Sequence, residues 1–265
     1  NASGVWNLRE VYDAVMGGYW PNANGGSRAL FMGGQAPGLQ TTIDFINMVA
    51  PGDATDFGDL TTATSGAQAM GSFTRGVFAG GNTPGVSNVM SYVTIASAGN
   101  AADFGDLQAG NQQLSANGNA VRGTVAGGLN PGNTNVIQLI TLSSVGNTTD
   151  FGDLTLGRHG LGQATSPTRA VVAGGQGAPG DVNTIDFYQI MTTGNATDFG
   201  DLTEVKRGVS GTSSSTRGVF TGGAPGLFTT TEFVTIASQG NGTDYGNLTT
   251  ATRNVGFASD SRRAY

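Results

Sequence analysis

Apolar and polar positions along the chain follow one pattern that returns every 46 to 48 residues. Its most regular phrase, Thr-Asp-Phe-Gly-Asp-Leu, stands at residues 55–60, 149–154 and 197–202, with changed copies at 102–107 and 243–248. The first Asp of each copy lies at 56, 103, 150, 198 and 244, which gives steps of 47, 47, 48 and 46 residues. A near-constant period of this size is typical of repeat architectures.

Each repeat contains four segments that predict short strands. One is an apolar run between an Arg and two glycines, as in residues 28–34, and a variable Gly/Pro/Asn loop follows it. Next come a run rich in β-formers, as in 184–190, the Asp-Phe-Gly-Asp phrase, and a stretch of small residues such as 208–216. Four-stranded units of this period are β-propeller blades. We predict an all-β propeller of five blades over residues 28–265, with six blades as the alternative.

The two ends of the chain lie outside the five full repeats. Residues 254–261 resemble the small-residue strand that precedes each Arg, so we expect them to complete the first blade and close the ring. The alternative is a sixth, composite blade built from residues 1–27 and the C-terminus. Residues 1–27 also carry an apolar stripe at helical spacing, namely Leu8, Val11, Tyr12, Val15 and Met16. This stripe predicts a short helix that caps the domain or attaches it to a larger assembly.

Composition and charge narrow the classes of partner. The chain has 45 Gly, 12 basic and 18 acidic residues, and no basic run, so we expect no nucleic-acid partner. It has no Cys, which excludes disulfides and thiolate metal sites. No apolar run approaches the roughly 20 residues of a membrane-spanning helix, so no such span is expected. Although Gly, Ser and Thr are abundant, apolar residues recur at the same positions of every repeat, which argues against disorder.

Charged residues recur at two positions of the repeat. We call the Arg before each apolar run the Arg column and the Asp positions of the Asp-Phe-Gly-Asp phrase the Asp column. This regular placement indicates a structural role. Because the chain holds so few charges, we predict Arg–Asp pairs around the ring, with the second Asp of each phrase capping a turn. The predicted ring consists of Arg28, Arg75, Arg122, Arg169, Arg217, Asp56, Asp103, Asp150, Asp198 and Asp244. Two carboxylates three residues apart also suit calcium, but the spacing is sparser than in a calcium loop. We therefore predict no metal and no cofactor, with calcium as the alternative.

Candidate chemistry is sparse, and the variable loops are the best binding candidates. The chain has one His, His159, among glycines, and its carboxylates recur alike in every repeat, so we predict that it is not an enzyme. Loops on a rigid ring commonly carry recognition, although inter-blade packing is the alternative for their apolar residues. The predicted binding residues are Gln35, Leu39, Asn82, Asn130, Gln176, Leu227 and Phe228.

The repeat resembles the kelch repeat over residues 28–265, through its apolar run before two glycines and its later aromatic positions. It departs from that repeat where Phe57, Phe104, Phe151, Phe199 and Tyr245 stand in place of the usual Trp. The phrases Gly-Asn-Ala-Thr-Asp-Phe-Gly-Asp-Leu-Thr and Thr-Arg-Gly-Val-Phe are similar to kelch-like repeats of virion and tail-fibre proteins of marine bacteriophages. The resemblance implies a virion or extracellular location and a non-enzymatic binding role. The partners it implies are virion or surface-assembly proteins, and a host-surface glycan or protein. The alternatives are a secreted lectin-like propeller and a carbohydrate-active enzyme.

Overall fold

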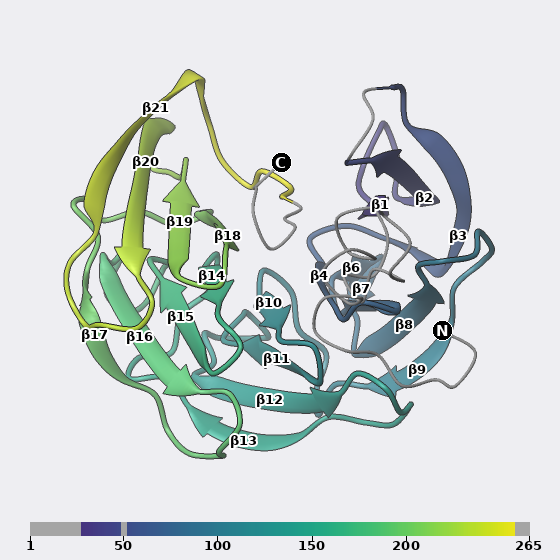
Figure 1. Ribbon diagram of the computed structural model, residues 1–265, viewed down its shortest axis with the longest axis horizontal. Coiled ribbons are helices and arrows are strands. Elements are labelled where there is room, and N and C mark those ends of the chain that lie inside the picture. Colours follow the sequence, from purple (N-terminus) through teal and green to yellow (C-terminus); the bar gives the residue numbers. More distant parts are fainter. Residues whose placement is uncertain (1–27, 49–51, 258–265) are drawn as a thin grey trace, which may run out of the picture.

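The computed structural model describes residues 28–48 and 52–257, which form an all-β propeller of five antiparallel blades (Figure 1). Blade 1 contains β1 (Arg28–Met32), β2 (Gln40–Asn47) and β3 (Thr55–Thr64). Blade 2 contains β4 (Gln68–Gly71), β5 (Arg75–Ala79), β8 (Val89–Thr94) and β9 (Ala102–Asp106), and its loop holds β6 (Asn82–Thr83) and β7 (Gly85–Val86). Blade 3 contains β10 (Ser115–Gly118), β11 (Arg122–Ala126), β12 (Val136–Thr141) and β13 (Thr149–Asp153). Blade 4 contains β14 (Gly162–Thr165), β15 (Arg169–Ala173), β16 (Thr184–Gln189) and β17 (Thr197–Asp201). Blade 5 contains β18 (Ser210–Ser213), β19 (Arg217–Thr221), β20 (Phe228–Thr235) and β21 (Thr243–Thr252).

These sheets confirm the predicted five blades and their four-stranded plan. Blade 1 has three strands within the described part of the chain, because β1 pairs only with β2 there. The expected completion of that blade by residues 254–261 falls largely on residues outside the description, and residues 254–257 are not in a strand. The predicted helix in residues 1–27 and the composite sixth blade also lie outside the described residues. In the described ranges, no helix is long and apolar enough to cross a membrane.

The Asp-Phe-Gly-Asp phrase forms the outer strand of each blade and contains a β-bulge. In blade 4 the register moves from Asp186 opposite Asp198 to Ile185 opposite Gly200, so Phe199 has no partner of its own on β16. The bulge turns the Phe199 ring inward, where it is 2 % exposed and meets Phe187 edge-on at 5.7 Å between ring centroids.

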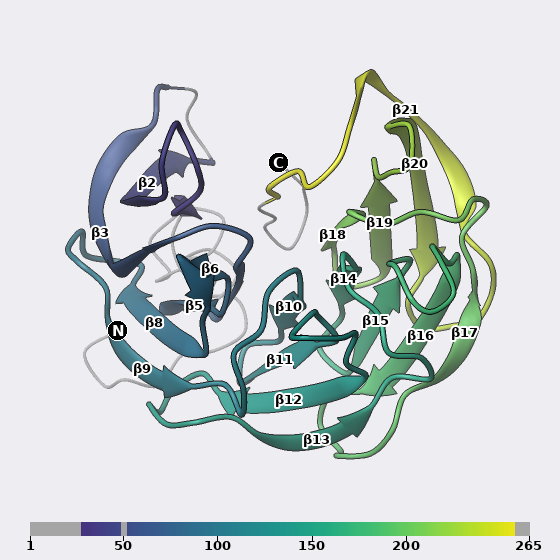
Figure 2. The same cartoon turned by 180° about the vertical axis from the view of Figure 1, so that it is seen from behind.

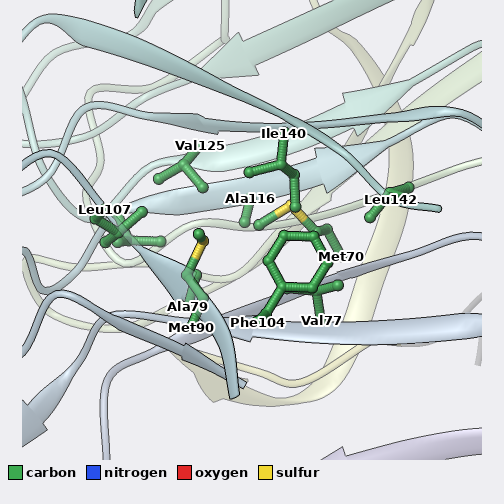
Figure 3. Packing of buried hydrophobic residues seen from close by; sticks show 11 residues of the cluster. Met70, Val77, Ala79, Met90, Phe104, Leu107, Ala116, Val125, Ile140 and Leu142 are labelled. Carbon is green, nitrogen blue, oxygen red and sulfur yellow. The ribbon is translucent and has the colours of Figure 1, made fainter. Parts of the chain in front are cut away.

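Hydrophobic burial takes place between blades more than within them. One core cluster joins Met70, Met90 and Phe104 of blade 2 to Val125 and Ile140 of blade 3 (Figure 3). A single twisted sheet cannot bury its own faces, so each blade depends on the next one for its core. This is why the repeat has to recur several times to be stable.

The outer strands are also joined by backbone hydrogen bonds across each internal junction. At the junction of blades 3 and 4, Gly194 and Ala196 donate their N–H groups to Phe151 and Asp153 at 2.8 Å each. The Asn195 side chain accepts a hydrogen bond from the Asp153 N–H at 3.1 Å. The glycine of the outer strand is needed here, because a Cβ at Gly152 would lie 2.5 Å from the Gly194 carbonyl.

Among the described residues, the ring is open between blade 5 and blade 1. Both views show a gap between β21 and the blade of β1 to β3 (Figures 1 and 2). On the blade 5 side of the gap Tyr245 is 61 % exposed, and on the blade 1 side Phe31 is 42 % exposed. A Cβ at Gly246 would have no neighbour within 4 Å, in contrast to the equivalent glycines of the internal junctions.

Candidate functional site

The five variable loops lie at one end of the ring, which we call the loop face. In blades 2 to 5 each loop connects the second and third strands, and the corresponding loop of blade 1 connects β1 and β2. Each loop follows two glycines with positive φ, such as Gly174 (φ 66°) and Gly175 (φ 108°). Each is closed by a backbone hydrogen bond to the carbonyl of the second glycine. The five donors are Gln40, Ser87, Thr134, Val182 and Phe228, at 2.8 to 3.0 Å. The loops therefore share one frame although their sequences differ.

The connector between consecutive blades reaches the same face and braces the loop of the following blade. In blade 4, His159 of the connector and Gln176 of the loop exchange backbone hydrogen bonds at 3.1 and 2.8 Å. Arg207 and Ala224 make the equivalent exchange in blade 5, at 2.9 and 2.7 Å. The loops are thus fixed from both sides, which presents their side chains on a rigid surface.

Blades 3 to 5 carry a row of polar side chains on the loop face, which we call the polar ridge. It consists of Asn133, His159, Gln176, Asp181 and Arg207. His159 Nδ1 lies 2.7 Å from Asn133 Oδ1, and Arg207 pairs with Asp181 at 3.0 Å. Arg207 keeps 36 % of its side chain exposed in this pair, against 10 % for Asp181. Side-chain contacts thus link Asn133 to His159 and Asp181 to Arg207, and backbone bonds join His159 to Gln176. The ridge offers polar groups to a ligand on the loop face.

The environment of His159 keeps its imidazole neutral at neutral pH. Burial lowers the pKa of His159, and the positive charge of Arg207 lowers it further, against a smaller opposing effect of Asp181. Because an amide oxygen can only accept, Nδ1 donates to Asn133 and Nε2 of the neutral ring remains an acceptor. His159 thus acts as a fixed hydrogen-bonding group of the ridge.

All the predicted binding residues lie on the loop face, but only Gln176 belongs to the polar ridge. Gln35, Asn82 and Asn130 are exposed, and Leu39 and Gln176 are half-buried. Asn130 already donates its side-chain N–H to Gly110 O at 2.7 Å.

Blade 5 contributes the two apolar candidates. Leu227 is 47 % exposed in its loop. Phe228 is half-buried as the first residue of β20, with Lys206 Nζ 5.8 Å above its ring. Sequence reasoning did not select Asn133, Asp181 or Arg207, and it treated His159 as an ordinary loop residue.

The predicted pairing of the Arg and Asp columns is wrong. Arg169 stacks over Phe187 of its own blade at 4.6 Å and donates to the Ile236 carbonyl of the next blade at 3.0 Å. Arg28, Arg75 and Arg122 reach the equivalent carbonyls at 2.9 to 3.2 Å, and no column Arg pairs with a column Asp among the described residues.

The reason is the order of the strands, because Arg169 lies on β15, Asp198 lies on β17, and β16 separates them. The first Asp of each phrase, from Asp56 to Asp244, is exposed. The predicted cap by the second Asp is not formed either, because no backbone N–H in the described part of the chain donates to its carboxylate. The backbone N–H of that Asp instead donates to Asn195 Oδ1 or the equivalent Asn.

Two buried ion pairs take the structural role that was expected of the columns. Arg158 pairs with Asp186 at 2.9 Å and Lys206 pairs with Glu232 at 2.6 Å, and all four side chains are 0 % exposed. Burial lowers the pKa of Arg158, and Asp186 opposes that shift. No group of three or more His, Asp or Glu side chains in the described ranges converges on a point that could hold a metal ion.

Comparisons with known proteins add no family to these observations. A scan against protein-family models finds no match, and neither does a comparison with curated protein sequences. The fold therefore stands on the geometry of the chain itself.

Proposed function

We propose that the protein is a non-enzymatic binding module of the virion-associated or tail-fibre type. In this proposal a kelch-like ring is the scaffold, and the loop face contacts a host-surface glycan or protein, or another virion subunit. The proposal rests on the contrast between the shared backbone closure of the loops and their different side chains. Five loops are closed by the same backbone hydrogen bond, and they present different side chains on that common frame.

Variable loops held on a common rigid scaffold are the arrangement on which recognition surfaces are built. The polar ridge adds the partly exposed guanidinium of Arg207 and the half-buried amide of Gln176, beside the buried imidazole of His159. These groups form directed hydrogen bonds and offer little apolar area. A hydroxyl-rich ligand such as a surface glycan matches that chemistry better than an apolar one.

The similarity of the repeat phrases to those of bacteriophage virion and tail-fibre proteins supports a place on a particle surface. The carboxylates of the outer strands recur in every blade, which favours a scaffold role over an active site, because a single reaction centre requires asymmetry. The sparse charge and lack of Cys also suit a component exposed outside the cell.

The experiment is a screen of the whole protein against a glycan array and intact cells, followed by two matched variants. Arg207→Ala removes the exposed cation of the polar ridge, and we expect it to weaken the binding that the screen detects. Arg253→Ala is the control, because Arg253 occupies the same connector position at the open end of the ring and is exposed outside the ridge. Equal binding by both variants would contradict the role of the ridge.

Two further results would favour a different function for the protein. Release of new reducing ends from a bound glycan would favour a carbohydrate-active enzyme. Absence of the protein from purified particles of its source would favour a secreted lectin-like propeller. Labelling intact particles with an antibody against the loop face tests the location directly.

A further inference from the structure

The dipeptide Asn117-Gly118 ends β10, the innermost strand of blade 3 (Figure 1). In the described ranges one other Asn is followed by Gly, in the dipeptide Asn241-Gly242 at the junction of blades 4 and 5. A backbone nitrogen that follows Asn can attack the side-chain amide of that Asn, and it is least hindered in Gly, which has no side chain. The two dipeptides differ in whether the fold leaves this nitrogen available.

The backbone N–H of Gly118 is not used by the sheet. Asn119 donates to Arg122 O at 2.9 Å across the turn to β11. Because successive residues of a strand direct their backbone groups to opposite sides, the N–H of Gly118 points away from β11. It donates to Asn117 Oδ1 at 2.8 Å. The fold therefore holds the attacking nitrogen against the amide that it would attack, which is a near-attack arrangement.

The side-chain carbonyl of Asn117 is also bonded to the next blade. Thr165 Oγ1 lies 3.1 Å from Asn117 Oδ1 and 2.9 Å from Gly118 O. Attack on Asn117 Cγ places negative charge on Oδ1, and a hydroxyl donor already positioned at that oxygen stabilises the charge. Asn117 and Gly118 are only half-buried, so water and solvent base can reach them.

Asn241-Gly242 has the same sequence and the opposite arrangement. Gly242 donates its N–H to Asp201 O at 2.8 Å, and Asn241 Oδ1 accepts from the Asp201 N–H at 3.1 Å. The attacking nitrogen is thus bonded to another strand. Asn241 is exposed, so solvent access alone would favour reaction at Asn241 over Asn117. The pair of sites separates the effect of geometry from that of exposure.

The fold requires Gly at position 118 but does not require Asn at position 117. A Cβ at Gly118 would lie 2.5 Å from Arg122 O. The position of Asn117 is held by Met70, Ala164 and Thr212 in the inner strands of blades 2, 4 and 5. The reactive dipeptide is therefore particular to blade 3.

We propose that Asn117 is a site of spontaneous modification, at which it is converted to aspartate and isoaspartate through attack by Gly118 N. The nitrogen gives its proton to a solvent base, the N–Cγ bond forms, and the Cγ–Nδ2 bond breaks to release ammonia. Water then adds to either carbonyl of the cyclic imide and opens it to one of the two products. Water is the co-reactant of the overall conversion. The inference is independent of the proposed function, because Asn117 lies at the end of β10 that is opposite the loop face.

The modification weakens the junction of blades 3 and 4. Asn117 Nδ2 donates to Gln163 O at 3.3 Å, and a carboxylate at this position would set an acceptor against that carbonyl. Isoaspartate also lengthens the backbone by a methylene group, which disturbs the pairing of residue 117 with Thr124. We therefore expect protein that has been stored in alkaline buffer to melt at a lower temperature than fresh protein.

The test is incubation of the whole folded protein in mildly alkaline buffer, followed by tryptic peptide mapping and enzymatic detection of isoaspartate. Trypsin places Asn117 in peptide 76–122 and Asn241 in peptide 218–253, and it separates both from a third Asn-Gly that lies outside the described residues. We expect Asn117 to be converted several-fold faster than Asn241. In urea the two rates should become equal, because the dipeptides are identical. Equal rates in the folded protein, faster conversion of Asn241, or a rate at Asn117 far below its rate in urea would overturn the proposal.

Two variants test the roles of individual groups. Thr165→Val removes the hydroxyl donor and keeps the shape of the side chain, so we expect several-fold slower conversion of Asn117 and no change at Asn241. An unchanged rate at Asn117 would overturn the role of Thr165. Asn117→Gln is the control for the loss of stability, and we expect it to keep its melting temperature on storage. If it loses stability as fast as the parent, the modification of Asn117 does not weaken the ring. The comparison of Asn117 with Asn241 uses the parent protein, so it holds whether or not a variant folds.

Discussion

Equivalent positions of the repeat have different surroundings at the junction of blades 4 and 5 and at the open end of the ring. Phe199 and Tyr245 occupy the same place in the outer strand and meet Phe187 and Phe233 edge-on at 5.7 and 5.8 Å. Phe199 is 2 % exposed, whereas Tyr245 is 61 % exposed. Each blade therefore forms its sheet and its aromatic pair by itself, but the aromatic ring of its outer strand is buried only by the blade that follows.

The comparison also separates two kinds of polar contact. Contacts within a blade, such as an Arg stacked on an aromatic ring, are equally formed in blades 4 and 5. Contacts to a following blade, such as the bonds from Gly240 and Gly242 to Phe199 and Asp201, have no described counterpart on β21. Matched substitutions at equivalent positions can therefore measure what a junction contributes to stability.

The largest effect is expected from Asp186→Ala at a closed junction. The substitution leaves the fully buried Arg158 without its charged partner, so it should destabilise the protein by about 3–5 kcal/mol. Asp44→Ala is the control, because Asp44 holds the same position on the uncovered face of blade 1, where it is half-buried and has no ion pair among the described residues. We expect it to cost about 0–1 kcal/mol.

Urea unfolding followed by circular dichroism measures both losses. Similar losses for Asp186→Ala and Asp44→Ala would show that the buried pair does not depend on the closed junction. The double variant Arg158→Met/Asp186→Leu should recover most of the stability, because it removes both charges together.

A smaller difference is expected between Gly200→Ala and Gly246→Ala. Both glycines have positive φ, at 146° and 134°, so both substitutions carry backbone strain of about 1–2 kcal/mol. A Cβ at Gly200 would also lie 2.6 Å from Gly240 O, whereas a Cβ at Gly246 would meet nothing within 4 Å. We expect Gly200→Ala to be worse by about 1–3 kcal/mol in the same unfolding measurement. Equal losses would mean that the outer strands are not in contact in solution.

The architecture could be predicted from sequence because the strands of one blade follow one another directly along the chain. The 47-residue step, the double glycine and the alternating strands all act within one repeat, so they are visible in any single copy. The period also outweighs the weak propensity signal of a chain this rich in Gly, Ser and Thr. The five predicted blades were confirmed for this reason.

The contacts between repeats were predicted poorly because the linear pattern does not show which strands are neighbours. Arg169 and Asp198 lie at a constant offset, but one strand separates them, which is about 10 Å in a sheet. The buried ion pair recurs at only two junctions, as Arg158 with Asp186 and Lys206 with Glu232, whereas Thr64 and Ser91 hold these positions at the first junction. Its repeat signal is therefore weak. The polar ridge spans three blades, so no single repeat contains its signal.

The smallest effect in this series is expected from the two column arginines Arg169 and Arg217. Arg169→Ala removes a stacking contact at 4.6 Å and a hydrogen bond from the guanidinium to Ile236 O, so it should cost about 2–3 kcal/mol. Arg217 stacks on Phe233 at 4.5 Å but reaches no backbone carbonyl among the described residues, so Arg217→Ala should cost about 0.5–1 kcal/mol. The difference between the two unfolding free energies isolates the bond that crosses a junction. If Arg217→Ala is as costly as Arg169→Ala, the guanidinium of Arg217 must also have an acceptor beyond blade 5.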